Sequence, residues 1–78
     1  MKAFVQVMAQ ALVDNMEAVE VTEVDAQQTV VYELKVDKTD LGKVIGREGR
    51  IAGAMRVLLS AHAAKLKTGK RVVLEILE

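Results

Sequence analysis

The stretch DLGKVIGREGRI, residues 40–51, decides how the rest of the chain is organised. Gly46 and Gly49 stand three residues apart, with the charged residues Arg47 and Glu48 between them. Because glycine lacks a Cβ atom, it adopts positive φ angles and lets a second backbone approach closely. Short apolar segments flank the pair, so the stretch predicts a tight turn between two helical pieces. Peptide N–H groups and the positive dipole end of the following helix would then suit a phosphate group.

Helical spacing of apolar residues predicts three helices. The first covers residues 2–15, with a buried stripe of Phe4, Val5, Met8, Leu12 and Val13. A short second helix covers residues 41–45, capped by Thr39 or Asp40. The third runs from Gly49 to Lys65 or Leu66. Its predicted core stripe consists of Ile51, Met55, Leu58, Leu59, His62 and Leu66.

Alternating apolar and polar residues predict three strands. The first covers residues 19–22, and Val24 breaks the alternation, which predicts a bulge or an early strand end. Residues 25–28 form the turn into the second strand, residues 29–36. Thr68 and Gly69 form the turn before the last strand, residues 71–77, whose inward side chains are Val72, Leu74 and Ile76.

The resulting order is α-β-β-α-α-β, an α+β fold. The first two strands pair as a hairpin, and the two-helix connection makes the second and third strands parallel. Such connections are almost always right-handed, which places the helices on one face. We therefore expect a three-stranded mixed sheet with three helices on one face.

Composition limits the possible functions. Seventy-eight residues predict one domain, residues 1–78. Without cysteine and with a single histidine, neither a disulfide nor a metal site is expected, and no cofactor is implied. No apolar run reaches membrane-spanning length, so a cytoplasmic protein is expected. Ser60 and His62 are two residues apart on a helix and point in different directions, and the glycine loop lacks a P-loop ending, so we do not expect an enzyme.

The formal net charge is zero, but the two halves differ. Residues 1–40 carry three basic and eight acidic side chains, a net charge of minus five, whereas residues 41–78 carry eight basic and three acidic ones, a net charge of plus five. The difference indicates an anionic partner for the second half. The alternative is that the two halves solvate the surface and pair with each other.

Residues 44–50, VIGREGR, resemble the Val-Ile-Gly-x-x-Gly signature of KH domains. Residues 41–43, Arg50, Arg56 and residues 71–73 extend the resemblance to the small bacterial KH proteins of the KhpA family, over essentially the whole chain. Ala52 departs from many KH domains, which carry a large aliphatic residue there. The resemblance implies a type II KH fold whose Gly-x-x-Gly loop grips single-stranded RNA.

Two groups of basic residues are then expected to border a binding groove. The glycine loop is one, and the turn around Lys67 and Lys70 is the other, corresponding to the variable loop of type II KH domains. The floor between them is predicted to be aliphatic, with Val44, Ile45 and Ile51 as candidates. The predicted RNA-binding residues are Lys43, Val44, Ile45, Gly46, Arg47, Glu48, Gly49, Arg50, Ile51, Lys67, Lys70 and Arg71. The alternative for the basic turn is a solvated loop.

The third helix also carries a strip of small and apolar residues outside its core stripe. The strip comprises Gly53, Ala54, Val57 and Ala61 and continues to Ala64, and Leu58 borders both this strip and the core stripe. Small residues let another backbone come close, so the strip predicts a homodimer contact; the alternative is an alanine-rich solvent face.

The sequence is interpreted as an RNA-binding module. Resemblance to the KhpA family implies an RNA chaperone or post-transcriptional regulator that forms homodimers, pairs with a larger KhpB-like KH protein and affects cell elongation and division. Phe4 and Tyr32 are both expected in the core, so base stacking on aromatic rings is not expected. Two alternatives stay open: a protein-interaction subunit, and a protein that binds single-stranded DNA.

Overall fold

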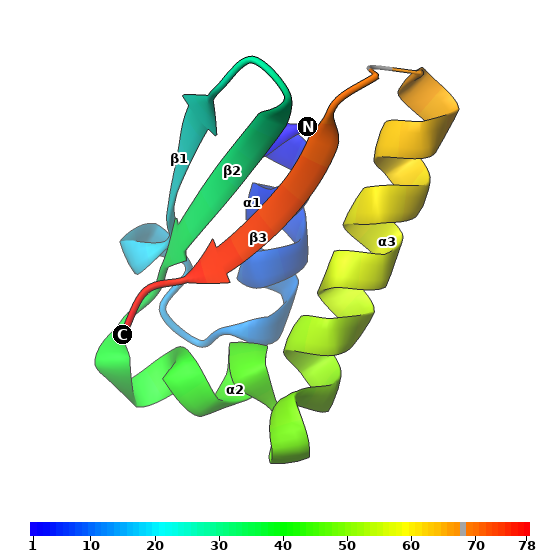
Figure 1. Cartoon of the computed structure of the whole chain (residues 1–78). Coiled ribbons are helices and arrows are strands. Elements are labelled where there is room, and N and C mark those ends of the chain that lie inside the picture. The colour runs from blue at the N-terminus through cyan, green and yellow to red at the C-terminus, as the bar shows by residue number, and fades with distance from the viewer. Residues whose placement is uncertain (68) are drawn as a thin grey trace.

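The computed structural model describes residues 1–67 and 69–78. A three-stranded sheet is its centre, formed by β1 (Glu20–Asp25), β2 (Thr29–Lys35) and β3 (Arg71–Ile76) in the order β1-β2-β3. β1 is antiparallel to β2, and β3 is parallel to β2. The hairpin and the parallel crossover predicted from the sequence are both confirmed (Figure 1).

Three α-helices complete the predicted α-β-β-α-α-β order: α1 (Lys2–Leu12), α2 (Leu41–Ile45) and α3 (Arg50–Leu66). α1 lies behind the sheet, and α3 runs beside β3 (Figure 1). The side chains that fill the core between helices and sheet include Val5, Leu34, Val44, Leu59 and Leu74. Three short 3-10 turns, η1 (Met16–Ala18), η2 (Lys38–Asp40) and η3 (Arg47–Gly49), were not predicted.

Two element ends differ from the sequence prediction by more than one residue. α1 ends at Leu12, because the next residue, Val13, has extended backbone angles and turns the chain away. β1 continues to Asp25 in unbroken register, with Val24 opposite Val31, so the predicted bulge or early end is wrong. Val24 is 47% exposed, and since successive strand residues face opposite sides, it lies on the sheet face away from the helices.

The buried face of α3 also differs from the prediction. Leu58 and Leu66, placed in the core stripe by their spacing, are 53% and 52% exposed. Small residues replace them in the core, and the buried side chains of α3 are Ala52, Met55, Leu59 and Ala63. The His62 ring packs against Phe4 of α1, with ring centroids 4.7 Å apart.

Candidate nucleic-acid interface

Gly46 ends α2 with φ 76° and ψ 173°, a combination that is essentially restricted to glycine. A Cβ atom added there would lie 2.6 Å from Cγ1 of Ile51 and 2.9 Å from its backbone nitrogen. The loop therefore passes directly over Ile51. Glycine is required at this position for two independent reasons, the backbone angles and the lack of space.

The rest of the loop turns into α3 through two further positive φ angles. Glu48 has φ 58° and Gly49 has φ 73°. The N–H of Gly49 donates to the Gly46 carbonyl at 3.2 Å, and the N–H of Arg50 donates to the Arg47 carbonyl. These two amides are therefore already used within the loop. The side chains of Arg47, Glu48 and Arg50 are exposed and can contact a ligand, and the N-terminus of α3 lies behind them.

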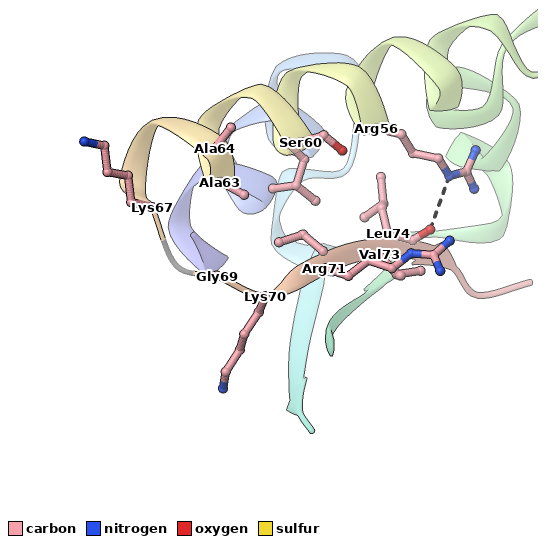
Figure 2. Close-up of a pocket in the computed structure, with 12 residues that line it drawn as sticks. Arg56, Ser60, Ala63, Ala64, Lys67, Gly69, Lys70, Arg71, Val73 and Leu74 are labelled. Atoms are coloured by element: carbon pink, nitrogen blue, oxygen red, sulfur yellow. Dashed lines mark hydrogen bonds between the residues drawn. The ribbon is translucent and has the colours of Figure 1, made fainter. Parts of the chain in front are cut away.

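A groove runs between α3 and β3, in two adjoining parts. The first part, of about 670 Å³, extends to the turn before β3 and is bordered by Leu59 and Ala63 on the helix and by Lys67, Lys70 and Arg71 at its end (Figure 2). The second part, of about 430 Å³, extends toward the glycine loop, where Ile45, Gly49 and Ala52 line it. Arg56, Val73 and Leu74 border both parts. The groove thus joins the glycine loop to the basic turn.

Comparison with known proteins identifies this arrangement. The family model of the KhpA/KhpB KH domain matches residues 2–76.

The chain belongs to the KhpA/KhpB family of KH domains.

Two curated proteins named RNA-binding protein KhpA show how similar the KH domain is to its relatives. The protein from Aquifex aeolicus is 55% identical over 78 residues, covering 100% of this chain and 96% of its own length. The protein from Caldanaerobacter subterraneus is 52% identical over 77 residues, covering 99% of this chain and 100% of its own.

The groove of this KH domain has a different floor from the predicted one. Val44 was predicted to contact RNA, but its side chain has no exposed surface and is part of the hydrophobic core. Ile51 is half-buried beneath Gly46. Ile45 lines the groove, and the rest of its apolar floor is made by Ala52, Leu59 and Ala63 of α3, with Val73 and Leu74 of β3. The small residue at position 52, which departs from many KH domains, was the sequence signal that could have located it.

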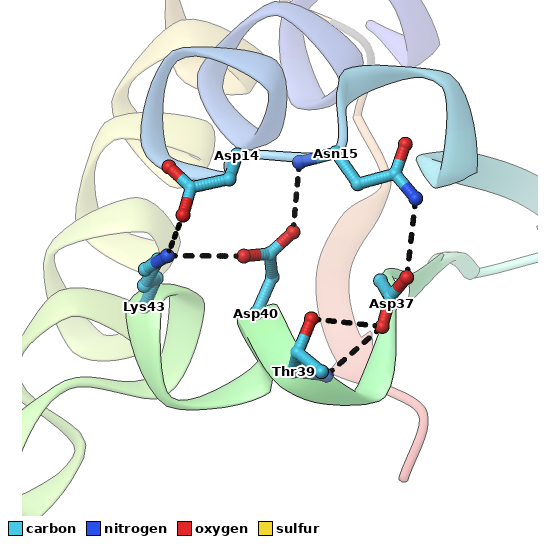
Figure 3. A network of polar contacts seen from close by, with 6 residues as sticks. All are labelled: Asp14, Asn15, Asp37, Thr39, Asp40 and Lys43. Carbon is cyan, nitrogen blue, oxygen red and sulfur yellow. Dashed lines mark hydrogen bonds and ion pairs between the residues drawn. The ribbon is translucent and has the colours of Figure 1, made fainter.

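Lys43 was predicted to contact RNA, but it does not line the groove. Its ammonium group pairs with the carboxylate of Asp14, two residues after the end of α1, and with that of Asp40 at 3.2 Å (Figure 3). Hydrogen bonds to these two carboxylates raise the pKa of Lys43. The charge of Lys43 is thus balanced within the protein, and the residue anchors α2 to α1.

Asp40 is the buried centre of this network, with 1% of its surface exposed. It accepts a hydrogen bond from the Asn15 backbone N–H at 2.9 Å, which lowers the pKa of Asp40. Asp40 occupies the predicted N-cap position of α2, but its side chain makes no capping hydrogen bond there. The capping side chain is that of Asp37, which precedes η2 and accepts from the Thr39 N–H at 3.0 Å. The network holds the short helix that carries the glycine loop.

The acidic and basic halves of the sequence also lie on different sides of the molecule. Glu20, Glu23 and Asp25 are exposed on β1, at the sheet edge farthest from α3 in the strand order (Figure 1). The exposed arginines of the loop and Arg56 lie on the α3 side. Lys70 reaches toward β1 and pairs with Asp25 at 2.5 Å. These arginines therefore lie on the side that holds the groove, where Glu75 and Glu78 also line its second part.

Among the described residues, no cluster of three or more potential ligands could hold a metal ion. The same part of the chain contains no helix with the length and apolar character needed to cross a membrane.

Proposed function

We propose that this KH domain binds single-stranded RNA in the groove between α3 and β3. The observation that carries the proposal is the groove itself, which has the glycine loop at one end and Lys67, Lys70 and Arg71 at the other. The relatives named RNA-binding protein KhpA match the whole length of the chain, which supports the same ligand here. The family is one of RNA-binding KH proteins and not a class of enzymes.

Three regions of the proposed site contact different parts of the RNA. Gly46, Arg47, Glu48, Gly49 and Arg50 would hold the sugar-phosphate backbone, with Ile45 beside them at the groove. The aliphatic floor would contact the bases. The basic turn would attract the phosphates that follow. Tyr32 is buried and Phe4 packs on His62, so these rings offer no stacking platform, and affinity would rest on clamping, apolar contact and hydrogen bonds.

The test is a double variant, Arg47→Asp with Glu48→Asp, which lowers the loop charge by two. Both side chains are exposed, so the fold should be kept, as checked by circular dichroism and thermal melting. We expect binding to short single-stranded RNA, measured by fluorescence anisotropy, to be lost.

The matched control is Lys38→Asp, the same charge change at an exposed residue that lines neither part of the groove. It should bind RNA nearly as the wild type does. Unchanged affinity in the folded loop variant would refute the proposed site. Equal affinity for DNA of the same sequence would favour the alternative of a general single-strand binder.

A second proposal is that two copies associate through α3. Val57 and Leu58 are 68% and 53% exposed on this helix, and a Cβ atom added at Gly53 would meet nothing within 4 Å. Ala54 and Ala61 continue the strip, so another helix could approach closely. A twofold contact needs a self-complementary patch, and burying these side chains would add stability to a small domain.

Analytical ultracentrifugation tests this association. Val57→Asp or Ala61→Arg should give a folded monomer, whereas Val7→Asp, the same change at an equally exposed valine on α1, should leave the dimer intact. A monomeric wild type at tens of micromolar would refute the dimer. A dimer that survives both α3 variants would place the contact elsewhere. We propose that a larger KhpB-like KH partner competes with the second copy for the same strip. Such competition is expected for an RNA chaperone or regulator that works in assemblies.

A further inference from the structure

Arg56 occupies the middle of the groove, and no predicted role accounts for it. Its side chain extends from α3 toward β3, and its Nε–H donates to the Leu74 carbonyl at 3.3 Å (Figure 2). Among the described residues, Arg56 is the charged side chain that borders both parts of the groove. The lysines lie at one end and the glycine loop at the other, so Arg56 lies where a base would be held.

The hydrogen bond to Leu74 fixes where the guanidinium lies. The N–H groups of Arg71 and Leu77 donate to carbonyls of β2 and the residue before it, so the odd-numbered residues of β3 direct their backbone groups toward β2. Alternate residues of a strand face opposite edges, so the backbone groups of Leu74 point toward the groove. Arg56 takes up that carbonyl and is thereby held against the edge of β3.

The N–H donors of Arg56 that the Leu74 carbonyl does not use favour particular bases. A guanidinium has five N–H donors in a planar fork, and the Leu74 carbonyl uses the one on Nε. The two Nη groups then carry four donors and no acceptor. Such a fork pairs with two adjacent acceptor atoms, as Arg does with O6 and N7 of guanine. O2 and N3 of cytosine are a second adjacent pair. Uracil places an N–H donor between its two carbonyls, and adenine places its amino group beside its N1 and N7 acceptors.

We propose that Arg56 is a specificity-determining residue that contacts a base with two adjacent acceptors, guanine or cytosine, at the centre of the groove. This inference rests on the proposed RNA binding and adds a base preference to it. One bidentate pair discriminates between bases by about 1–3 kcal/mol, which corresponds to roughly five- to 150-fold in affinity.

The experiment uses four nonamers of uridine that differ only in the central base, U, A, G or C, with affinity and salt dependence measured by fluorescence anisotropy. The wild type should bind the G or the C nonamer at least about fivefold more tightly than the U and A nonamers. The G and C arms identify which acceptor pair is read. Arg56→Lys keeps the positive charge and a donor for Leu74 but lacks the fork, so it should lose the preference while keeping the salt slope. Arg56→Gln should also lose the preference, because it lacks the fork of donors.

Three outcomes would overturn the inference. The first is a wild type that binds all four nonamers equally. The second is an Arg56→Lys variant, folded by circular dichroism, that keeps the full preference. The third is an Arg56→Gln variant that weakens all four nonamers by the same factor, since that pattern belongs to a phosphate contact. Absence of binding to every nonamer would overturn the proposed function together with this inference, whereas equal binding would overturn the inference alone.

Discussion

Three glycines around the loop should respond in three different ways to the same change, Gly→Ala. Gly46 has φ 76° and ψ 173°, and its new Cβ atom would lie 2.6 Å from Cγ1 of Ile51. Gly49 has φ 73° but open space around it. Gly42 lies inside α2, also with open space. Backbone strain and crowding are thus separated by position within one loop.

The magnitudes follow from these geometries. At Gly46, a glycine-only backbone conformation costs an alanine about 1–3 kcal/mol, and the overlap with Ile51 adds about 1–3 kcal/mol. At Gly49, the left-handed conformation alone costs about 1–2 kcal/mol. At Gly42, alanine in a helix should stabilise by about 0.5–1 kcal/mol. Because the free energy of unfolding of a native protein is only about 5–15 kcal/mol, the Gly46 variant should lose a large share of its stability.

Urea unfolding followed by circular dichroism measures the three free energies of unfolding, and a melting temperature shift of about 4–8 °C per kcal/mol gives an independent scale. Gly42→Ala should melt above the wild type, Gly49→Ala below it, and Gly46→Ala lowest. A Gly46→Ala protein as stable as Gly49→Ala would refute the reasoning, because it would show that the loop relaxes around the new methyl group.

Three further predictions concern titration and salt. Burial raises the pKa of Tyr32, the single tyrosine, to about 12, so its ultraviolet absorbance should change near pH 12, together with unfolding. The stability that the neutral tyrosine contributes is present below pH 10 and is lost as the pH rises through 12. A simple titration of the absorbance near pH 10 would contradict this. Hydrogen bonds lower the pKa of Asp40 from 3.8, so the stability that its carboxylate contributes is present above that pH and is lost as the pH falls below it. The melting temperature of Asp40→Asn should therefore fall less steeply in acid than that of the wild type. Parallel curves of melting temperature against pH would contradict this. Lys67→Ala should lower the salt slope of RNA binding by roughly 0.7 per lost phosphate contact, and Lys70→Ala by less, because Lys70 already pairs with a carboxylate; unchanged slopes in both would place the turn away from the RNA.

Most of the fold could be predicted because its signals are local. Every second residue of β2 is buried, β3 carries Val72, Leu74 and Ile76 at alternate positions, and the two glycines mark the junction of α2 and α3 without any knowledge of distant contacts. The continuation of β1 past Val24 could not be predicted, because pairing with Val31 outweighs the loss of alternation on an edge strand.

The site was harder to predict because its residues are chosen by tertiary contacts. Lys43 and Arg56 look equivalent in the sequence, yet one pairs with Asp14, 29 residues earlier, and the other reaches Leu74, 18 residues later. The same holds for the floor. Helical spacing ranks Leu58 above Ala52 as a core residue, but α3 packs closely enough for alanine to fill the contact. Spacing along one helix carries no information on how near its neighbour lies.

The separation of charge across the molecule bears on how fast an RNA finds the groove. A strand of phosphates approaching β1 meets the exposed carboxylates of Glu20, Glu23 and Asp25, whereas one approaching α3 meets arginines. A protein with no net charge can therefore still turn an approaching polyanion toward one side before contact. Encounters would begin in an orientation close to the bound one, and the association rate would fall with ionic strength although the total charge is zero.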